Sequence, residues 1–213
     1  MSAVLVDLTG PAGRLEALLD EAADGGPPPR AAVVFGHPHP QHGGTMHTKA
    51  VYQGAKGLGR IGCAVLRFNF RGVGSSAGTF DDGAGEIADY RAALDLMSSR
   101  YPETPLWTAG FSFGSWVALE AGADDPRVSA LIAVAPPVSG RGYEFPRVLD
   151  SDKPKFFIQG GLDELCPLKE LWAFYAKLKE PKELVVIDGA NHLFEGKTRE
   201  VGEALEDLLG DLE

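Results

Sequence analysis

Residues 105–122, PLWTAGFSFGSWVALEAG, contain the pattern that decides the fold. The apolar run PLWTAG predicts a buried strand, and SWVALEAG predicts a helix. Residues 110–114, GFSFG, match the G-x-S-x-G pattern at the point where strand becomes helix. On such a sharp turn the positions two residues either side of the serine are crowded, so both must be glycine. The turn lifts the hydroxyl out of the sheet, and the positive end of the helix faces it. This context predicts Ser112 as a nucleophile.

A second match lies at residues 74–78, GSSAG, and it shows that the pattern alone is weak evidence. Ser76 lies several residues beyond the apolar run at 63–70, and more loop follows it. No strand leads directly into this match, and no helix leaves it. We therefore interpret Ser76 as a turn serine in a glycine-rich loop.

Strands and helices alternate along the rest of the chain, which predicts a parallel sheet with helices on both faces. Short apolar runs predict further strands at 31–36, 63–70, 128–135, 155–160 and 183–189, and helical spacing predicts helices at 48–57, 86–101, 168–178 and 201–212. Before these elements, residues 4–8 and 14–21 flank a GPAG turn and predict an antiparallel hairpin. The leucine spacing of the second segment fits a helix equally well.

Two further residues follow predicted strands and suit a serine nucleophile, which needs a base and an acid that orients it. His192 comes just after the last strand, so it belongs at the carboxyl edge of the sheet, where such folds bind ligands. Asp163 follows the strand at 155–160. Glu164, beside it, is an alternative acid, and Asp188 is a weaker one that is nearer to His192 in sequence.

Residues 36–47, GHPHPQHGGTMH, hold four of the five histidines. His37, His39 and His42 fall close to the H-x-H-x-D-H zinc motif of metallo-β-lactamase-like hydrolases, so a metallohydrolase is an alternative. Gln41 stands where that motif has its acid and cannot supply a carboxylate. Prolines at both intervening positions stiffen the backbone. We therefore predict no metal at this loop.

The chain order Ser112, Asp163, His192 is that of the α/β-hydrolases, and two blocks make the resemblance specific. Residues 37–46, HPHPQHGGTM, and 67–78, RFNFRGVGSSAG, resemble a compact group of bacterial α/β-hydrolases related to dienelactone hydrolases and acyl peptidases. The resemblance implies a mostly parallel, twisted sheet with helices on both faces and an antiparallel N-terminal hairpin. It also implies a serine esterase without a cofactor. From this resemblance and the chain length, we expect one domain over residues 1–213.

The hydrolase interpretation gives the histidine loop a different task. Attack on an ester creates an oxyanion, which two backbone N–H groups must stabilise. One would come from Phe113, after the nucleophile, and the other from His39, because Pro38 and Pro40 have no N–H. We interpret the remaining loop histidines as packing and hydrogen-bonding residues.

The segment between the strands at 128–135 and 155–160 is too short for a helical lid, so we expect no large cap domain. Tyr143, Phe145 and Val148 form either a short flap or a covered loop. We expect Phe111, Tyr143 and Arg71 to shape the pocket, although Arg71 fits a structural ion pair equally well. An open site suggests small or short-acyl esters as substrates, with thioesters and peptides as alternatives.

The formal net charge of −10 argues against nucleic acid or an anionic membrane surface as a partner. The first ten residues lack the basic start of a secretory leader, and no apolar stretch is long enough for a spanning helix. The two cysteines, Cys63 and Cys166, are too few for a disulfide framework. We therefore expect a cytoplasmic enzyme that acts on a small-molecule ester, and the sequence leaves its oligomeric state open.

Overall fold

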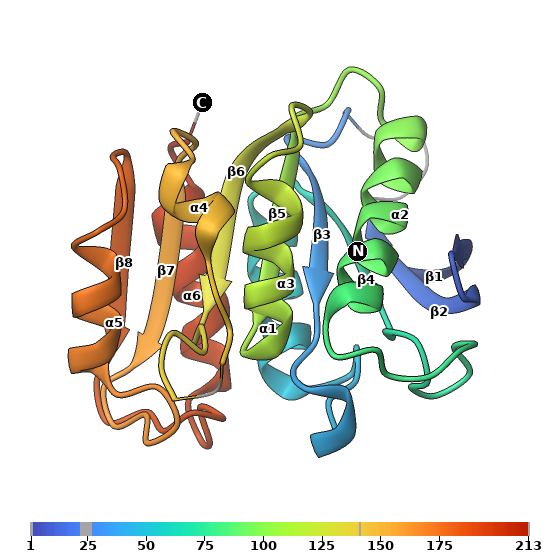
Figure 1. Cartoon of the computed structure of the whole chain (residues 1–213). Helices are drawn as coiled ribbons and strands as arrows, with labels where there is room; N and C mark the ends of the chain where they lie inside the picture. Colours follow the sequence, from blue (N-terminus) through green and yellow to red (C-terminus); the bar gives the residue numbers. More distant parts are fainter. Residues whose placement is uncertain (1, 22–26, 141, 213) are drawn as a thin grey trace.

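A computed structural model describes residues 2–21, 27–140 and 142–212, and in it an eight-stranded sheet has the order β1-β2-β4-β3-β5-β6-β7-β8 (Figure 1). The strands are β1 (Ser2–Gly10), β2 (Gly13–Glu21), β3 (Ala32–Gly36), β4 (Ala64–Phe68), β5 (Leu106–Phe111), β6 (Val128–Val134), β7 (Lys155–Gly160) and β8 (Lys182–Ile187). The helices are α1 (Lys49–Arg60), α2 (Ala84–Arg100), α3 (Phe113–Gly122), α4 (Pro146–Asp150), α5 (Leu168–Tyr175) and α6 (Thr198–Leu209), and a short 3₁₀ turn, η1, spans Pro40–His42.

The N-terminal residues form the antiparallel hairpin that the GPAG turn predicts. Strands β1 and β2 pair along their whole length, and β2 also pairs antiparallel with β4. The helical alternative for residues 14–21 is wrong. Leu15, Ala17 and Leu19 are buried and alternate with more exposed residues, which is the period of a strand with one face on the core.

The remaining strands, from β3 to β8, pair in parallel and alternate their side chains between two apolar layers. On one layer Val34, Leu131 and Phe157 pack against α2, α3 and α5, and on the other Val33 and Ile132 pack against α1 and α6. Figure 1 shows the same division, with α2, α3, α4 and α5 in front of the sheet and α1 and α6 behind it. Both faces are covered, which is why the strands read as continuous apolar runs.

Most elements begin or end one to three residues from the predicted bounds, and the ends of α5 and β4 have an identifiable cause. Helix α5 ends at Tyr175, because the chain turns there and the Leu178 N–H donates to the Tyr175 carbonyl. Leu178 is still buried, so the apolar spacing that predicted a longer helix includes a core residue beyond the end of α5. Strand β4 ends at Phe68, because the next N–H groups leave the ladder: Asn69 donates to the Glu16 carbonyl and Phe70 to a histidine ring.

Residues 136–140 and 142–154 carry α4 alone, and no cap domain is present in this described part of the connection. Phe145 and Val148 are buried in the front apolar layer, and the Phe145 ring packs 4.8 Å from that of Phe174. The segment is therefore a covered loop and not a flap. Among the described residues, none of the helices combines the length and the apolar character needed to cross a membrane.

Candidate active site

Ser112 lies on a tight turn between β5 and α3. Its φ and ψ are 53° and −123°, so it is one of the few residues other than glycine with a positive φ. The Ser112 N–H donates to the Val134 carbonyl of β6 at 2.8 Å. Its own carbonyl accepts from the N–H and the hydroxyl of Ser115, at 2.9 and 2.6 Å. These bonds hold the strained turn, as expected where strain serves a site.

The two glycines of the GFSFG stretch are required by close backbone contacts. A Cβ on Gly110 would lie 2.1 Å from the Gly114 carbonyl oxygen, and a Cβ on Gly114 would lie 2.4 Å from the His37 carbonyl oxygen. The second contact brings the loop after β3 against the start of α3. The glycines therefore shape the turn at Ser112 and also seat the histidine loop beside it.

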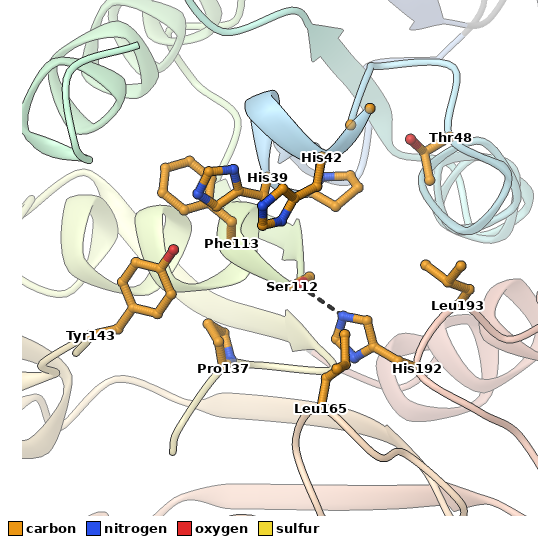
Figure 2. Close-up of a pocket in the computed structure, with 13 residues that line it drawn as sticks. His39, His42, Thr48, Ser112, Phe113, Pro137, Tyr143, Leu165, His192 and Leu193 are labelled. Carbon is orange, nitrogen blue, oxygen red and sulfur yellow. Dashed lines mark hydrogen bonds between the residues drawn. The ribbon is translucent and has the colours of Figure 1, made fainter. Parts of the chain in front are cut away.

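The hydroxyl of Ser112, the ring of His192 and the carboxylate of Asp163 form one hydrogen-bonded chain. His192 Nε2 lies 2.9 Å from Ser112 Oγ, and His192 Nδ1 lies 2.8 Å from Asp163 Oδ2. Figure 2 marks the first of these contacts with a dashed line. Three residues from three separate loops thus meet at the carboxyl ends of β5, β7 and β8.

The loops of Asp163 and His192 are fastened to each other. The Leu162 N–H donates to the Ala190 carbonyl at 2.9 Å, and the Gly161 N–H donates to the Ile187 carbonyl at 2.9 Å. A Cβ on Gly160 would lie 2.6 Å from the Ala190 carbonyl oxygen, so the close approach needs a glycine there. This backbone contact keeps the carboxylate at hydrogen-bond distance from the imidazole.

Asp163, and neither of its two sequence rivals, is the carboxylate at the histidine. Its side chain is fully buried, and Oδ1 accepts from the N–H groups of Leu165 and Cys166 at 2.9 and 2.8 Å. Glu164 and Asp188 are exposed. Several donors hold this buried carboxylate in one orientation, which suits it to orient an imidazole.

The histidine loop folds back over the start of α3. The His39 carbonyl accepts from the N–H groups of His42 and Gly44, both at 3.1 Å, and the His39 ring packs 5.1 Å from the Phe113 ring. Phe113 is the first residue of α3, so its N–H belongs to the first turn, where helices leave such groups without an internal partner. His39 and Phe113 both line the cavity that Ser112 lines, and Figure 2 shows their side chains next to each other beside Ser112.

His37 is buried and engaged through both ring nitrogens. Nε2 accepts from the Phe70 N–H at 3.1 Å, and Nδ1 lies 2.6 Å from the Pro38 carbonyl, to which it donates. Burial lowers the pKa of His37 to about 4, so the ring is neutral near pH 7. It has no lone pair left for a metal. Over the described ranges, no group of three or more histidine, cysteine or acidic side chains gathers as a metal site.

A cavity of about 310 Å³ opens beside Ser112 and His192. In Figure 2 Tyr143 stands at one end of it and Thr48 and Leu193 at the other. The described lining is Pro38, His39, His42, Gly43, Gly44, Thr48, Ser112, Phe113, Pro137, Tyr143, Leu165, His192 and Leu193. This lining contains no Asp, Glu, Lys or Arg, and most of it is apolar or aromatic.

Two residues predicted to shape the pocket do not line this cavity. Phe111 is fully buried behind the site, with its ring 5.5 Å from that of His192 and 6.0 Å from that of Phe194. As the last residue of β5, it points into the rear apolar layer. Phe111 therefore packs against the His192 ring from the rear apolar layer. Sequence spacing placed it near the serine without showing which face of the sheet it takes.

Arg71 is the second correction, and its structural alternative is the one observed. Its guanidinium makes a two-pronged contact with Asp89, at 2.9 and 2.8 Å, and lies 3.7 Å from Asp81. Arg71 is buried and absent from the cavity lining. The ion pair with Asp89 ties the glycine-rich loop to α2.

Ser76 fills the structural role assigned to it. Its hydroxyl donates to the Asn69 carbonyl at 2.7 Å and accepts from the Glu16 N–H at 2.9 Å. The second GxSxG match therefore belongs to a loop tied to β2. The surrounding elements, and not the five-residue pattern, separate the two serines.

Several residues at the site escaped sequence reasoning. Leu165 and Leu193 line the cavity although they are 45% and 52% exposed, and each lies within two residues of Asp163 or His192. A leucine close to a candidate catalytic residue in a loop is a signal that the sequence itself offers. Gln159 donates through Nε2 to Asp163 Oδ2 at 2.9 Å. It is the one amide in the otherwise apolar stretch FFIQG, a pattern that also could have drawn notice.

Comparison with known proteins gives close relatives over nearly the whole chain. A family model described as serine aminopeptidase, S33, matches residues 27–152. A solved α/β serine hydrolase homologue from Coxiella burnetii is 38% identical with a TM-score of 0.88, covering 98% of this chain and 97% of that one. A serine hydrolase without a lid from Xanthomonas campestris is 34% identical, also with a TM-score of 0.88, covering 98% and 94%. An uncharacterized protein from Rickettsia prowazekii is 36% identical over 94% of this chain and 86% of its own length.

The family match covers more than half of the chain, and the two solved serine hydrolases superpose on nearly all of it, one of them described as lacking a lid. The chain therefore belongs to the α/β-hydrolase superfamily, as a serine hydrolase without a lid.

Proposed function

We propose that this enzyme hydrolyses small or short-acyl carboxylic esters through an acyl-enzyme on Ser112. The observation that carries the proposal is the hydrogen-bonded chain from Ser112 Oγ through His192 to Asp163, with 2.9 and 2.8 Å separations. Those distances suit proton transfer without any rearrangement.

The reaction follows from the geometry in two halves. His192 Nε2 removes the proton of Ser112 as Oγ attacks the ester carbonyl, and the oxyanion is stabilised by the backbone N–H groups of His39 and Phe113. The imidazolium, oriented by Asp163, then protonates the leaving alcohol, and the acyl group stays on Ser112. Water, deprotonated by the same ring, attacks the acyl-enzyme and releases the acid.

The cavity lining supports a neutral ester over a peptide. An aminopeptidase must bind the free α-ammonium of its substrate, which an acidic side chain does well. The described lining offers no carboxylate for that purpose. The leucines, prolines and aromatic rings there suit a short hydrocarbon acyl group. Thioesters remain within reach of the same chemistry.

A fluorophosphonate probe and an ester assay test this proposal together. Wild type should be labelled at Ser112 and should hydrolyse p-nitrophenyl butyrate. Ser112→Ala and His192→Ala should each lose about 10⁴-fold or more in kcat, and their effects should not add, because the residues act as a unit. Ser76→Ala, which alters the other GxSxG serine, is the matched control and should keep both labelling and turnover. Undiminished turnover in Ser112→Ala would refute the proposal.

We also propose that the enzyme works in the cytoplasm. Cys63 and Cys166 are both buried free thiols, which suits a reducing compartment. Cell fractionation followed by activity-based labelling would test this location, and labelling confined to an extracellular fraction would contradict it.

A further inference from the structure

Gln159 is a buried polar side chain that the fold does not need. It lies in β7 two residues after Phe157 and is fully buried. Its Nε2 donates to Asp163 Oδ2 at 2.9 Å and to the Cys166 carbonyl at 2.7 Å. Its Oε1 is also buried, and no hydrogen-bond partner for it exists among the described residues.

The orientation of this amide is fixed by chemistry. Turned over, Oε1 would face a carboxylate oxygen and a carbonyl oxygen, neither of which can donate. The amide must therefore point its N–H groups at Asp163 and Cys166, and this leaves its carbonyl unsatisfied. A buried polar atom without a partner is costly, and an apolar side chain of similar volume would avoid that particular cost.

Gln159 and His192 bind the same oxygen of Asp163, Oδ2. Oδ2 accepts from Gln159 and from His192 Nδ1, whereas Oδ1 is held by the backbone N–H groups of Leu165 and Cys166. The backbone thus fixes one carboxylate oxygen and Gln159 fixes the other.

We propose that Gln159 is a positioning residue for catalysis: it holds Asp163 Oδ2 toward His192. The inference rests on the proposed triad and adds a residue to it. Gln159 is absent from the described cavity lining, so it acts through the loop it bonds to, at Asp163 Oδ2 and at the Cys166 carbonyl.

The titratable groups around this pair stay in place when Gln159 changes. His39 and His42 face His192 from the other side of the cavity. Glu164 is exposed beside Asp163, and burial raises the pKa of the Cys166 thiol to about 11, so it does not titrate near neutrality. A change in the pH profile that Gln159 variants alone produce therefore reports on the Asp163–His192 pair.

The test compares Gln159→Met, which keeps the volume and removes both donors, with wild type in p-nitrophenyl butyrate hydrolysis from pH 5 to 9. We expect kcat to fall about tenfold, the value of one hydrogen bond to a charged group, with KM changed less than about twofold. We also expect the ascending limb of kcat/KM to leave its wild-type position, because Asp163 Oδ2 is no longer held toward His192.

Ile158→Val is the matched control, since Ile158 is the adjacent buried residue of β7 and faces the other apolar layer. It should lower stability modestly without moving the pH limb or kcat. A Gln159→Met enzyme that matches this control would overturn the inference. If Ser112→Ala also kept its turnover, the proposed function itself would fall, so the two failures can be told apart.

A measurement on the wild-type chain avoids any folding defect of the variant. The side-chain amide protons of Gln159, followed by NMR, should exchange slowly with solvent and shift in step with the titration of His192. Fast exchange, or signals that ignore pH while His192 titrates, would count against the inference.

Discussion

His37 shows at the scale of one residue how a histidine-rich sequence can mislead. Its ring is held inside the protein by the Phe70 N–H and the Pro38 carbonyl. Neighbouring His39 instead lies at the cavity and stacks on His42 with ring centroids 4.4 Å apart. His37 thus has a different environment from His39 and His42, because the prolines and the 3₁₀ turn send its side chain in another direction.

The buried ring of His37 should make the protein sensitive to moderate acid. Its pKa is about 4 in the folded protein and near 6.5 unfolded, so the unfolded chain binds the proton more readily. The stabilisation is complete above pH 6.5 and is lost as pH falls toward 4, by up to about 3 kcal/mol. Urea unfolding at several pH values should show this slope in wild type.

The control for this slope is another histidine of the same loop. His37→Gln keeps an acceptor for the Phe70 N–H and should flatten the dependence between pH 6.5 and 4. His47→Gln, at an exposed position, should retain it. Equal slopes in His37→Gln and wild type would show that another group is responsible.

At the scale of elements, α1 and α6 approach each other through two glycines. A Cβ on Gly57 would lie 2.1 Å from the Gly202 carbonyl oxygen, and a Cβ on Gly202 would lie 2.4 Å from the Gln53 carbonyl oxygen. Helix α6 directly follows the loop that carries His192. The close packing of the two helices therefore sets where that loop begins and ends.

Gly57→Ala should destabilise the protein although alanine is the better helix former. The propensity gain of about 1 kcal/mol cannot offset a clash with backbone, which forces the helices apart, and we expect a net loss of about 2 kcal/mol or more. Thermal and urea unfolding measure it. Glu203→Ala, an exposed change on α6, should stay within about 0.5 kcal/mol. A Gly57→Ala protein as stable as wild type would contradict the packing described.

For the whole molecule, the absence of a lid and the uncharged lining together set the kind of substrate that fits. The cavity lies at the carboxyl edge of the sheet, and the segment at 136–140 and 142–154 is anchored in the core by Phe145 and Val148 while Pro137 and Tyr143 line the cavity. A charged acyl group would lose its hydration there without meeting a countercharge in the described lining, which is costly.

Neutral acyl esters should therefore be better substrates than charged ones of the same length. We expect kcat/KM for p-nitrophenyl butyrate to exceed that for the succinate half-ester and for the 4-aminobutyrate ester by about tenfold or more. The net charge of −10 would repel the first and attract the second. If kcat/KM is lower for both charged esters, the cause is the loss of hydration in the cavity, because the overall charge of the protein would lower it for the anionic ester only. A charged ester that equals the butyrate would contradict this prediction.

Local periodicity, turn chemistry and the rule that parallel strands end at one edge were enough to predict the alternating elements, the two glycines around Ser112 and the order of the three candidate site residues. Contacts in the folded chain were needed to show that residues 14–21 form a strand, that Phe111 turns behind the site, that Arg71 pairs with Asp89, and that Gln159 reaches Asp163. Which face a strand residue takes, and which partner a buried polar group finds, depend on contacts between segments far apart in the chain. Local spacing carries no record of them.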